Sequence, residues 1–207
     1  MKNKRCVVIG ASPETDARLI REMAGEDDFI ACADGGYVFA EMAGLSPDII
    51  IGDFDSSEHP GRPGCEVITL PVRKDDTDTM YVLKECLCRG FVSFLLLGMT
   101  GGSPDHTFAN ITALSFLCEH GAVGTIADKN GLITVRTAGT MTIQGRTGAR
   151  FSIFPFGCGS CTVTLRGFSY ELDSGTLNES FPLGVSNCIT DDNAMVRIES
   201  GKALIYF

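Results

Sequence analysis

Short apolar runs alternate with helix-compatible segments over roughly the first 130 residues of the chain. The apolar runs cover residues 5–9, 29–33, 49–51, 66–70, 91–97 and 122–127. The helix-compatible segments cover residues 14–24, 37–43, 77–89 and 107–120. Apolar runs of this length joined by helices are typical of parallel strands with crossover helices. The pattern therefore predicts an N-terminal, Rossmann-like α/β domain with a parallel sheet.

The pattern changes after about residue 129, where apolar and polar residues begin to alternate along each segment. The alternating segments cover residues 132–136, 140–144, 150–154, 161–165, 194–198 and 203–207. Gly, Asn and Asp turns separate them, and no helix-length pattern intervenes. This predicts a small antiparallel β-sandwich. We therefore expect an α/β domain over residues 1–128 and a β domain over residues 129–207.

Composition narrows the class of protein further. The net charge of −9 argues against a nucleic acid or an anionic membrane surface as the main partner, although ATP arrives with its own metal. The first apolar run is too short for a signal peptide, and no later run reaches ~18 apolar residues. Nine cysteines at irregular spacing favour buried thiols in a reducing compartment. We expect a cytoplasmic protein, and Cys158 and Cys161 are only weak candidates for a zinc or redox site.

Aspartates gather at four places in the N-terminal half of the chain. They are Asp34, the pair Asp53 and Asp55, the group Asp75, Asp76 and Asp78, and Asp105. Each cluster follows an apolar run or opens a helical pattern, so each should lie at the carboxyl edge of the sheet, where such folds bind ligands. Carboxylates gathered this closely repel one another unless a cation holds them. The clusters predict an oxygen-ligated divalent cation, Mg²⁺, and with it a polyphosphate substrate.

The pair in Gly52-Asp53-Phe54-Asp55-Ser56 has more than one interpretation. In an extended segment Asp53 and Asp55 point the same way, so both could reach one metal ion. A polar turn in which Asp55 or Ser56 caps the next segment is equally compatible with the spacing. A haloacid-dehalogenase phosphatase would use Asp53 as nucleophile and Asp55 as general acid. The Ser56-Ser57 that follows departs from the Gly-Thr of that motif.

Two further motifs precede helices. In Lys74-Asp75-Asp76-Thr77-Asp78, Asp75 and Asp78 can share a face, although helix capping alone would explain two of the three acids. The glycine-rich stretch 98–102 and the following Ser-Pro-Asp-His-Thr have the form of a phosphate loop at a helix N-terminus. A simple connection capped by Asp105 fits the same residues, and His106 could orient a phosphate or cap the helix.

Six motifs in this order resemble those of the thiamine pyrophosphokinase family, and the match covers nearly the whole chain. They are Ala-Asp-Gly-Gly at 33–36, Gly-Asp-Phe-Asp-Ser at 52–56, Lys-Asp-Asp-Thr-Asp at 74–78, Gly-Gly-x-x-Asp-His-Thr-x-Ala-Asn at 101–110, Arg-Gly-Phe-Ser-Tyr-Glu-Leu at 166–172 and Gly-Val-Ser-Asn at 184–187. The resemblance implies transfer of the ATP diphosphate to the hydroxyl of thiamine. It also implies a homodimer whose active site lies at the subunit interface.

The resemblance also assigns roles to residues of this chain. It implies Mg²⁺ binding by Asp53, Asp55 and Asp78, with Asp34 and Asp75 as further catalytic acids. It implies ATP binding by Gly101, Gly102, Asp105, His106, Thr107 and Asn110. It implies substrate binding by Lys74, Tyr170, Ser186 and Asn187.

The chain departs from the family pattern at three points. Ser103-Pro104 replaces the usual Arg and apolar residue before Asp105, Cys188 replaces a frequent acid, and the chain has no Trp. Stacking on a thiamine ring would therefore require Phe or Tyr. A non-catalytic sensor of thiamine or nucleotide, supported by Ser103-Pro104, and a zinc-structured β module at Cys158 and Cys161 remain as alternatives.

Overall fold

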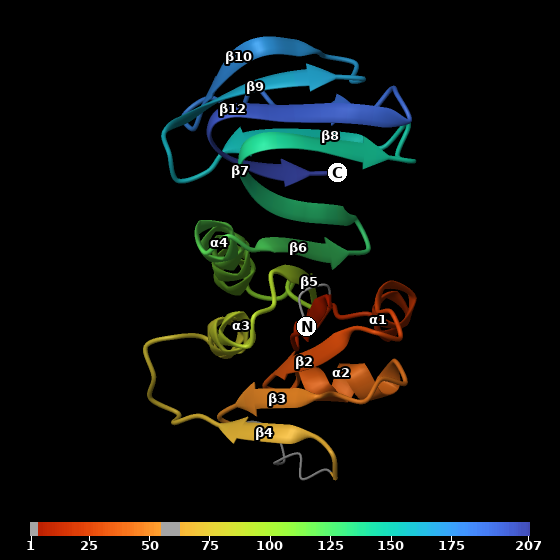
Figure 1. Ribbon diagram of the computed structural model, residues 1–207, viewed down its shortest axis with the longest axis vertical. Coiled ribbons are helices and arrows are strands. Elements are labelled where there is room, and N and C mark those ends of the chain that lie inside the picture. Colours follow the sequence, from red (N-terminus) through yellow and green to blue (C-terminus); the bar gives the residue numbers. More distant parts are fainter. Residues whose placement is uncertain (1–3, 55–62) are drawn as a thin grey trace. The chain divides into compact units, whose positions relative to one another are not determined.

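The computed structural model describes residues 4–54 and 63–207. The chain divides into two compact units, residues 1–130 and residues 131–207 (Figure 1). Among the described residues, no helix combines the length and the apolar character that a membrane crossing requires.

The first unit contains parallel strands connected by helices. Its strands are β1 (Cys6–Ile9), β2 (Phe29–Ala33), β3 (Ile49–Gly52), β4 (Glu66–Thr69), β5 (Ser93–Leu97) and β6 (Val123–Asp128). Its helices are α1 (Ala17–Met23), α2 (Gly36–Met42), α3 (Asp78–Cys88) and α4 (Pro104–Glu119). Every neighbouring pair of strands in the order β4-β3-β2-β1-β5-β6 is parallel. The predicted α/β architecture of this half is therefore present.

Burial explains why these segments form strands without alternation. All four residues of β1 and all four of β3 are buried, as expected when helices cover both faces of a parallel sheet. The strand order reverses at β1, which lies between β2 and β5. The connections that leave β1 and β5 run to different helices, so a crevice forms beyond the carboxyl ends of these two strands.

The second unit is built from antiparallel strands. They are β7 (Gly131–Gln144), β8 (Arg150–Pro155), β9 (Ser160–Arg166), β10 (Leu172–Asn178), β11 (Asn187–Cys188) and β12 (Asn193–Tyr206). The long strand β12 pairs with β7 along most of its length. On its other side, β12 pairs with β9 through residues 195–200 and with β8 through residues 203–206. Inward-facing apolar residues of these strands form one core, which includes Phe151, Ile153, Val163 and Val196.

The second unit differs from the sequence prediction in its strand boundaries. Segments 132–136 and 140–144 form the single strand β7, and segments 194–198 and 203–207 largely form the single strand β12. The glycine that suggested a turn in β12 instead occupies a register shift between Ile198 and Lys202. Gly201 has φ +84, and a Cβ there would lie 2.7 Å from the Ser160 carbonyl oxygen. Strands β10 and β11 were not predicted.

Candidate functional site

A cavity of about 590 Å³ lies in the first unit, at the carboxyl ends of β1 and β5. The loops after these strands, the segment leading into α3 and the first turns of α4 form its wall. The lining residues are Gly10, Ala11, Ser12, Pro13, Ala33, Asp34, Val72, Lys74, Asp76, Thr77, Asp78, Thr79, Gly98, Met99, Gly101, Ser103, His106, Ala109 and Asn110. The cavity thus collects residues from three of the predicted acidic or glycine-rich segments, namely those at Asp34, at residues 74–78 and at residues 98–110.

The loops after β1 and β5 contact each other directly through two glycines. A Cβ on Gly10 would lie 2.8 Å from the Gly98 carbonyl oxygen, and a Cβ on Gly98 would lie 2.6 Å from the Gly10 carbonyl oxygen. The Ser12 N–H donates to Gly98 O at 3.2 Å, and the Ser12 hydroxyl donates to Thr100 O. Because no side chain fits between them, both positions require glycine, and the two loops form one continuous wall of the cavity.

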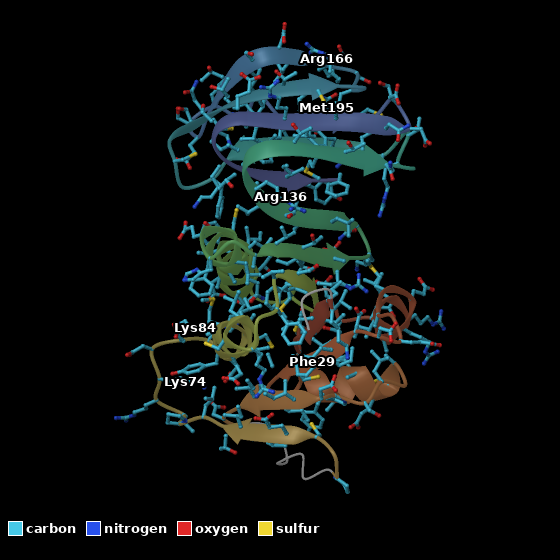
Figure 2. The ribbon with its side chains drawn as sticks, in the orientation of Figure 1. Phe29, Lys74, Lys84, Arg136, Arg166 and Met195 are labelled. Carbon is cyan, nitrogen blue, oxygen red and sulfur yellow. The ribbon has the colours of Figure 1, made fainter. Side chains whose placement is uncertain are left out.

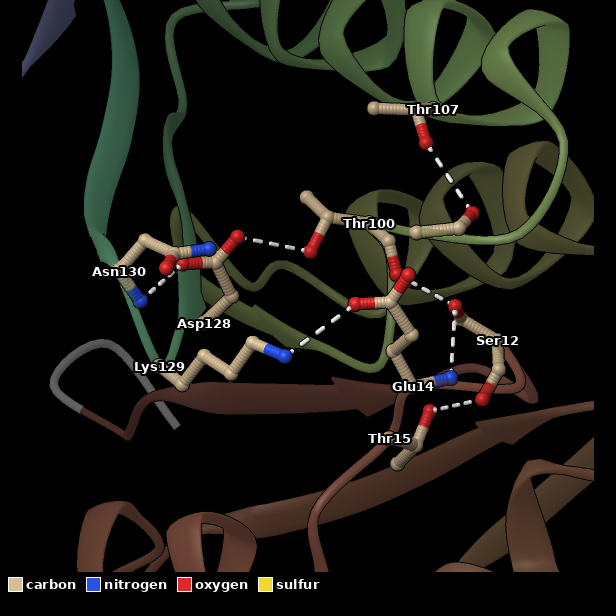
Figure 3. Close-up of polar contacts among 9 residues, drawn as sticks. Ser12, Glu14, Thr15, Thr100, Thr107, Asp128, Lys129 and Asn130 are labelled. Carbon is tan, nitrogen blue, oxygen red and sulfur yellow. Dashed lines mark hydrogen bonds and ion pairs between the residues drawn. The ribbon is translucent and has the colours of Figure 1, made fainter.

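A network of polar contacts extends this wall to the neighbouring segments (Figure 3). Thr100 Oγ1 donates to Asp128 Oδ2 at 2.8 Å, and the Asn130 N–H donates to Asp128 Oδ1 at 2.7 Å. The Thr107 hydroxyl on α4 lies 3.3 Å from the Gly101 carbonyl oxygen. The end of β6 and the start of α4 are therefore both tied to the loop that follows β5.

Lys74 joins two of the predicted metal-binding acids. Its ammonium group donates to Asp53 Oδ2 and lies 3.1 Å from Asp78 Oδ1. The Lys74 side chain is only 7% exposed, and Figure 2 shows it on the segment that leads into α3. The contact with Asp78 is an ion pair rather than an aligned hydrogen bond, because Asp78 Oδ1 is buried without a hydrogen-bond partner. Asp34 Oδ1 is likewise buried without one.

The charges of this cluster are unbalanced. Burial raises the pKa of the Asp78 carboxyl, Lys74 opposes that shift, and Asp53 and Asp34 add to it. Burial also acts to lower the pKa of Lys74, but the carboxylates of Asp53 and Asp78 outweigh it and raise the pKa. Lys74 therefore stays an ammonium ion that pairs with two carboxylates, and the carboxylate of Asp34 adds a further negative charge that acts on Asp78. A cluster of this kind favours the approach of another cation.

The backbone near these acids adopts an uncommon conformation. Asp34 has φ +44 and Phe54, which follows Asp53, has φ +52, both in the left-handed region. The end of β3 packs tightly on Asp34, since a Cβ on Gly52 would lie 2.7 Å from the Asp34 Cα. Left-handed backbone at a non-glycine residue costs about 1–3 kcal/mol and is concentrated at functional sites.

The donor set of this cluster fits a hard divalent cation. Asp34, Asp53 and Asp78 supply carboxylate oxygens, the ligands that Mg²⁺ prefers, and the two buried oxygens of Asp34 and Asp78 without hydrogen bonds are suited to a cation. Among the described residues, no three acids, histidines or cysteines are already arranged around one point as metal ligands. Asp55, the remaining predicted ligand, lies outside the described residues.

The predicted nucleotide-binding residues divide into two groups. Gly101, His106 and Asn110 line the cavity, and Asn110 Nδ2 is anchored to the Met99 carbonyl oxygen at 2.8 Å. Gly102, Asp105 and Thr107 do not line the cavity, although each is next in sequence to a residue that does. Asp105 accepts hydrogen bonds from the Ser103 hydroxyl and, at 2.9 Å, from the His106 N–H. The Ser103 hydroxyl contributes most to lowering the pKa of Asp105, which lies in the first turn of α4, whereas the N-cap residue of that helix is Ser103.

The segment before α3 differs from the predicted arrangement. Asp75 is exposed and does not line the described wall, whereas Asp76 lines it and forms an ion pair with Lys84. Sequence reasoning also missed Ser12 and Pro13 in the loop after β1. Their position directly after the first apolar run, at the same sheet edge as the acids, was the available signal.

The remaining predicted substrate residues lie in the second unit. Asn187 is buried, and its side chain binds both backbone polar groups of Tyr170. Asn187 Oδ1 accepts from the Tyr170 N–H at 3.0 Å, and Asn187 Nδ2 donates to the Tyr170 carbonyl oxygen at 2.7 Å. The Tyr170 side chain itself is 74% exposed. Ser186 is exposed and left-handed at φ +58, and its N–H donates to Ser152 Oγ at 3.1 Å.

Comparison with known protein families covers both units. Residues 20–122 match the model of the thiamin pyrophosphokinase catalytic domain, and residues 140–205 match that of the thiamin pyrophosphokinase vitamin B1 binding domain. The chain belongs to the thiamine pyrophosphokinase family. Membership accounts for the order of the six sequence motifs, since the two matched domains occur in the order in which those motifs were found.

Individual members of the family are similar over most of their length. Thiamine pyrophosphokinase of Bacillus subtilis is 29% identical over 77% of this chain and 75% of the relative. Thiamine pyrophosphokinase 3 of Oryza sativa subsp. japonica is 25% identical over 84% of this chain and 76% of the relative. The crystal structure of the Bacillus subtilis enzyme shares the fold, with a TM-score of 0.88 at 23% identity over 98% of both chains. That of thiamin pyrophosphokinase from Geobacillus thermodenitrificans has a TM-score of 0.85 at 25% identity over 98% of this chain and 96% of the other.

Proposed function

We propose that the protein is a thiamine diphosphokinase, which transfers the diphosphate of ATP to the hydroxyl of thiamine and releases AMP. The observation that carries this proposal is the match to a catalytic domain and a vitamin B1 binding domain in one chain. The acid-lined cavity of the first unit supports it, because its volume of about 590 Å³ suits a small-molecule ligand. In this proposal the first unit is a Rossmann-like nucleotide-binding domain and the second a thiamine-binding β-sandwich.

The cavity residues would bind and orient ATP. Asp53, Asp55 and Asp78 would hold Mg²⁺, which when bound supplies positive charge against the polyphosphate. Gly101, His106 and Asn110 would contact the nucleotide, because they line the same cavity. The protein's own task is then positioning and charge neutralisation rather than covalent chemistry.

Asp34 is the better candidate to orient the thiamine hydroxyl or accept its proton. Its carboxylate lines the cavity and has a buried oxygen without a hydrogen bond, whereas Asp75 is exposed away from the described wall. A carboxylate is a weak base, but in a loose transition state the proton can leave late. Lys74 would contribute positive charge near the polyphosphate.

Tyr170, Ser186 and Asn187 would form the thiamine side of the site. The thiazolium ring of thiamine is cationic, and an exposed aromatic ring such as that of Tyr170 can stabilise it. The family resemblance supports a homodimer in which the second unit of one subunit completes the site of the other. It also supports a cytoplasmic location, consistent with nine cysteines of which none forms a disulfide.

The decisive experiment measures AMP release from ATP and Mg²⁺ with and without thiamine, and identifies the product by chromatography. The proposal predicts AMP formation that requires thiamine and an equal amount of thiamine diphosphate. Release of inorganic phosphate from phosphate esters without thiamine would indicate a phosphatase that uses Asp53 as nucleophile. Thiamine binding without AMP release would indicate a sensor.

A further inference from the structure

Lys74 contacts the two carboxylates that a divalent cation would need. Its ammonium group donates to Asp53 Oδ2 and lies 3.1 Å from Asp78 Oδ1. All three side chains are largely buried, with exposures of 7% for Lys74, 12% for Asp53 and 24% for Asp78. Water therefore screens these interactions weakly.

One oxygen of Asp78 matters most. Asp78 Oδ1 is buried and makes no hydrogen bond, so it is a suitable ligand for a hard cation. It is also the oxygen that lies 3.1 Å from the Lys74 ammonium. A divalent cation bound at this oxygen would lie next to the ammonium, and the two positive charges would repel each other.

We propose that Lys74 is an internal counter-ion that competes with the divalent cation for Asp53 and Asp78. This inference rests on the metal site of the proposed function and adds a regulatory property to it. Without nucleotide, the ammonium balances part of the charge of the acids, so the cation alone binds weakly. A polyphosphate in the same cavity gives the displaced ammonium a new anionic partner, because Lys74 itself lines that cavity. Metal and nucleotide then bind cooperatively, and Lys74 is a positioning residue for both.

The test is a titration of the nucleotide-free protein with Mn²⁺, followed by the electron paramagnetic resonance signal of free Mn²⁺. We expect Lys74→Met to bind Mn²⁺ at least tenfold more tightly than the unmodified protein. Lys84→Met is the matched control, because it removes the same charge from a nearby ion pair with Asp76 and leaves Asp53 and Asp78 unchanged. An affinity in Lys74→Met that is weaker, or unchanged within twofold, would overturn the proposal. An equal gain in Lys84→Met would overturn it as well, since the effect would then be a general charge effect.

A second titration uses the same variants with α,β-methylene-ATP, whose bridging carbon blocks transfer, at saturating Mn²⁺. We expect Lys74→Met to bind this analogue several-fold more weakly, because the displaced ammonium is missing. One variant would thus gain affinity for the metal and lose affinity for the nucleotide, which misfolding does not produce. Unchanged nucleotide affinity would overturn the part of the proposal that turns Lys74 toward the polyphosphate.

Two further controls keep the test interpretable. Lys74→Gln should repeat the gain in Mn²⁺ affinity if Lys74→Met folds poorly, and circular dichroism reports the fold of each variant. The Mn²⁺ titration contains no thiamine and measures no turnover. Failure of the counter-ion proposal therefore leaves the assay for thiamine-dependent AMP release as an independent test of the proposed function.

Discussion

The acidic cavity of the first unit and the chain around Tyr170 in the second unit (the Tyr170 turn) differ in whether their buried polar groups have hydrogen-bond partners. In the cavity, buried oxygens of Asp34 and Asp78 have no hydrogen-bond partner, and one ammonium group serves two carboxylates. At the turn, the buried side chain of Asn187 satisfies both the N–H and the carbonyl of Tyr170. The cavity holds uncompensated charge, whereas the turn is internally complete.

This difference separates two ways of preparing a binding site. Unbalanced buried charge is unfavourable in the free protein and becomes favourable only when a ligand of opposite charge arrives. A hydrogen-bonded turn stabilises the free protein and fixes the backbone that carries the exposed ring of Tyr170. We therefore expect substitutions in the cavity to affect turnover, and substitutions at the turn to affect thiamine affinity.

The largest effect is expected from Asp78→Asn. This change keeps the shape of the side chain but removes a charge from the proposed metal site, so turnover should fall by orders of magnitude. The rate of thiamine-dependent AMP release measures the effect, and circular dichroism should show an intact fold. Asp173→Asn, which changes an exposed carboxylate paired with Arg166, is the matched control and should keep normal turnover. Near-normal turnover in Asp78→Asn would contradict the role of this acid.

A smaller effect is expected from Tyr170→Ala. Cation–π contacts contribute about 0.5–2 kcal/mol, so loss of the ring should raise the KM for thiamine by about 2- to 30-fold. The KM for ATP should not change, since Tyr170 lies in the second unit. Tyr170→Phe keeps the aromatic face and should behave like the unmodified protein. Equal losses in both variants would assign the effect to the hydroxyl instead.

Asn187→Ala should weaken thiamine binding indirectly, through the backbone of Tyr170. The backbone N–H and carbonyl of Tyr170 lose their partner, so the free energy of unfolding should fall by about 1–3 kcal/mol. The KM for thiamine should rise by no more than in Tyr170→Ala, and the double variant should show little further increase. Loss of stability with an unchanged KM for thiamine would limit Asn187 to a purely structural role.

The smallest effect is expected in the stability of Asp78→Asn and in how that stability depends on pH. Burial raises the pKa of Asp78 in the folded protein, so its ionised form destabilises the fold above that pKa, and stability is regained as the pH falls through it. Asp78→Asn should therefore be slightly more stable than the unmodified protein at pH 7, by a few degrees in Tm, because ~1 kcal/mol shifts Tm by about 2–4 °C at this size. The advantage should shrink as the pH is lowered.

The pKa of Asp28 shifts in the opposite direction, so its substitution should change the stability of the protein with the opposite sign. Burial acts against its ionised form, but hydrogen bonds from Arg5 and from the Gly25 N–H outweigh burial and lower the pKa. Asp28→Asn should therefore be less stable than the unmodified protein at pH 7, and the difference should vanish as the pH falls below the folded-state pKa. Melting curves from pH 7 down to acidic pH distinguish the two variants. Parallel behaviour of both would contradict the assigned shifts.

The sequence predicted the first unit closely because local signals and tertiary structure agree there. The run 29–33 became β2 with the same limits, and the helix predicted over 77–89 became α3 over Asp78–Cys88. In the second unit, glycines were taken as turns, whereas Gly201 lies within β12 at a bulge. A bulge depends on the partner strand, which spacing along one strand does not reveal.

The site was predictable only at the level of the sheet edge. Strand ends and aspartate clusters placed Asp34, Asp53 and Asp78 in one region, and the structure brings their charges together. The shared contact of Lys74 with Asp53 and Asp78 could not be predicted, because Lys74 lies in an irregular segment whose path depends on tertiary packing. The same limit applies to the hydrogen bonds between the Asn187 side chain and the backbone of Tyr170, while the substrate contact of Asn187 stays a prediction.

The central position of β12 has a consequence for biosynthesis. Strands β7, β8 and β9 all pair with residues 193–206, so none of them gains this partner until that segment has been translated, although β9 can pair with β10 and β8 with β11 before then. Until then β7, β8 and β9 each keep unpaired the edge that will face β12, while the parallel sheet of the first unit can already form. Nascent chains stalled before residue 193 should therefore expose the second unit to chaperones and proteases and leave the first unit protected.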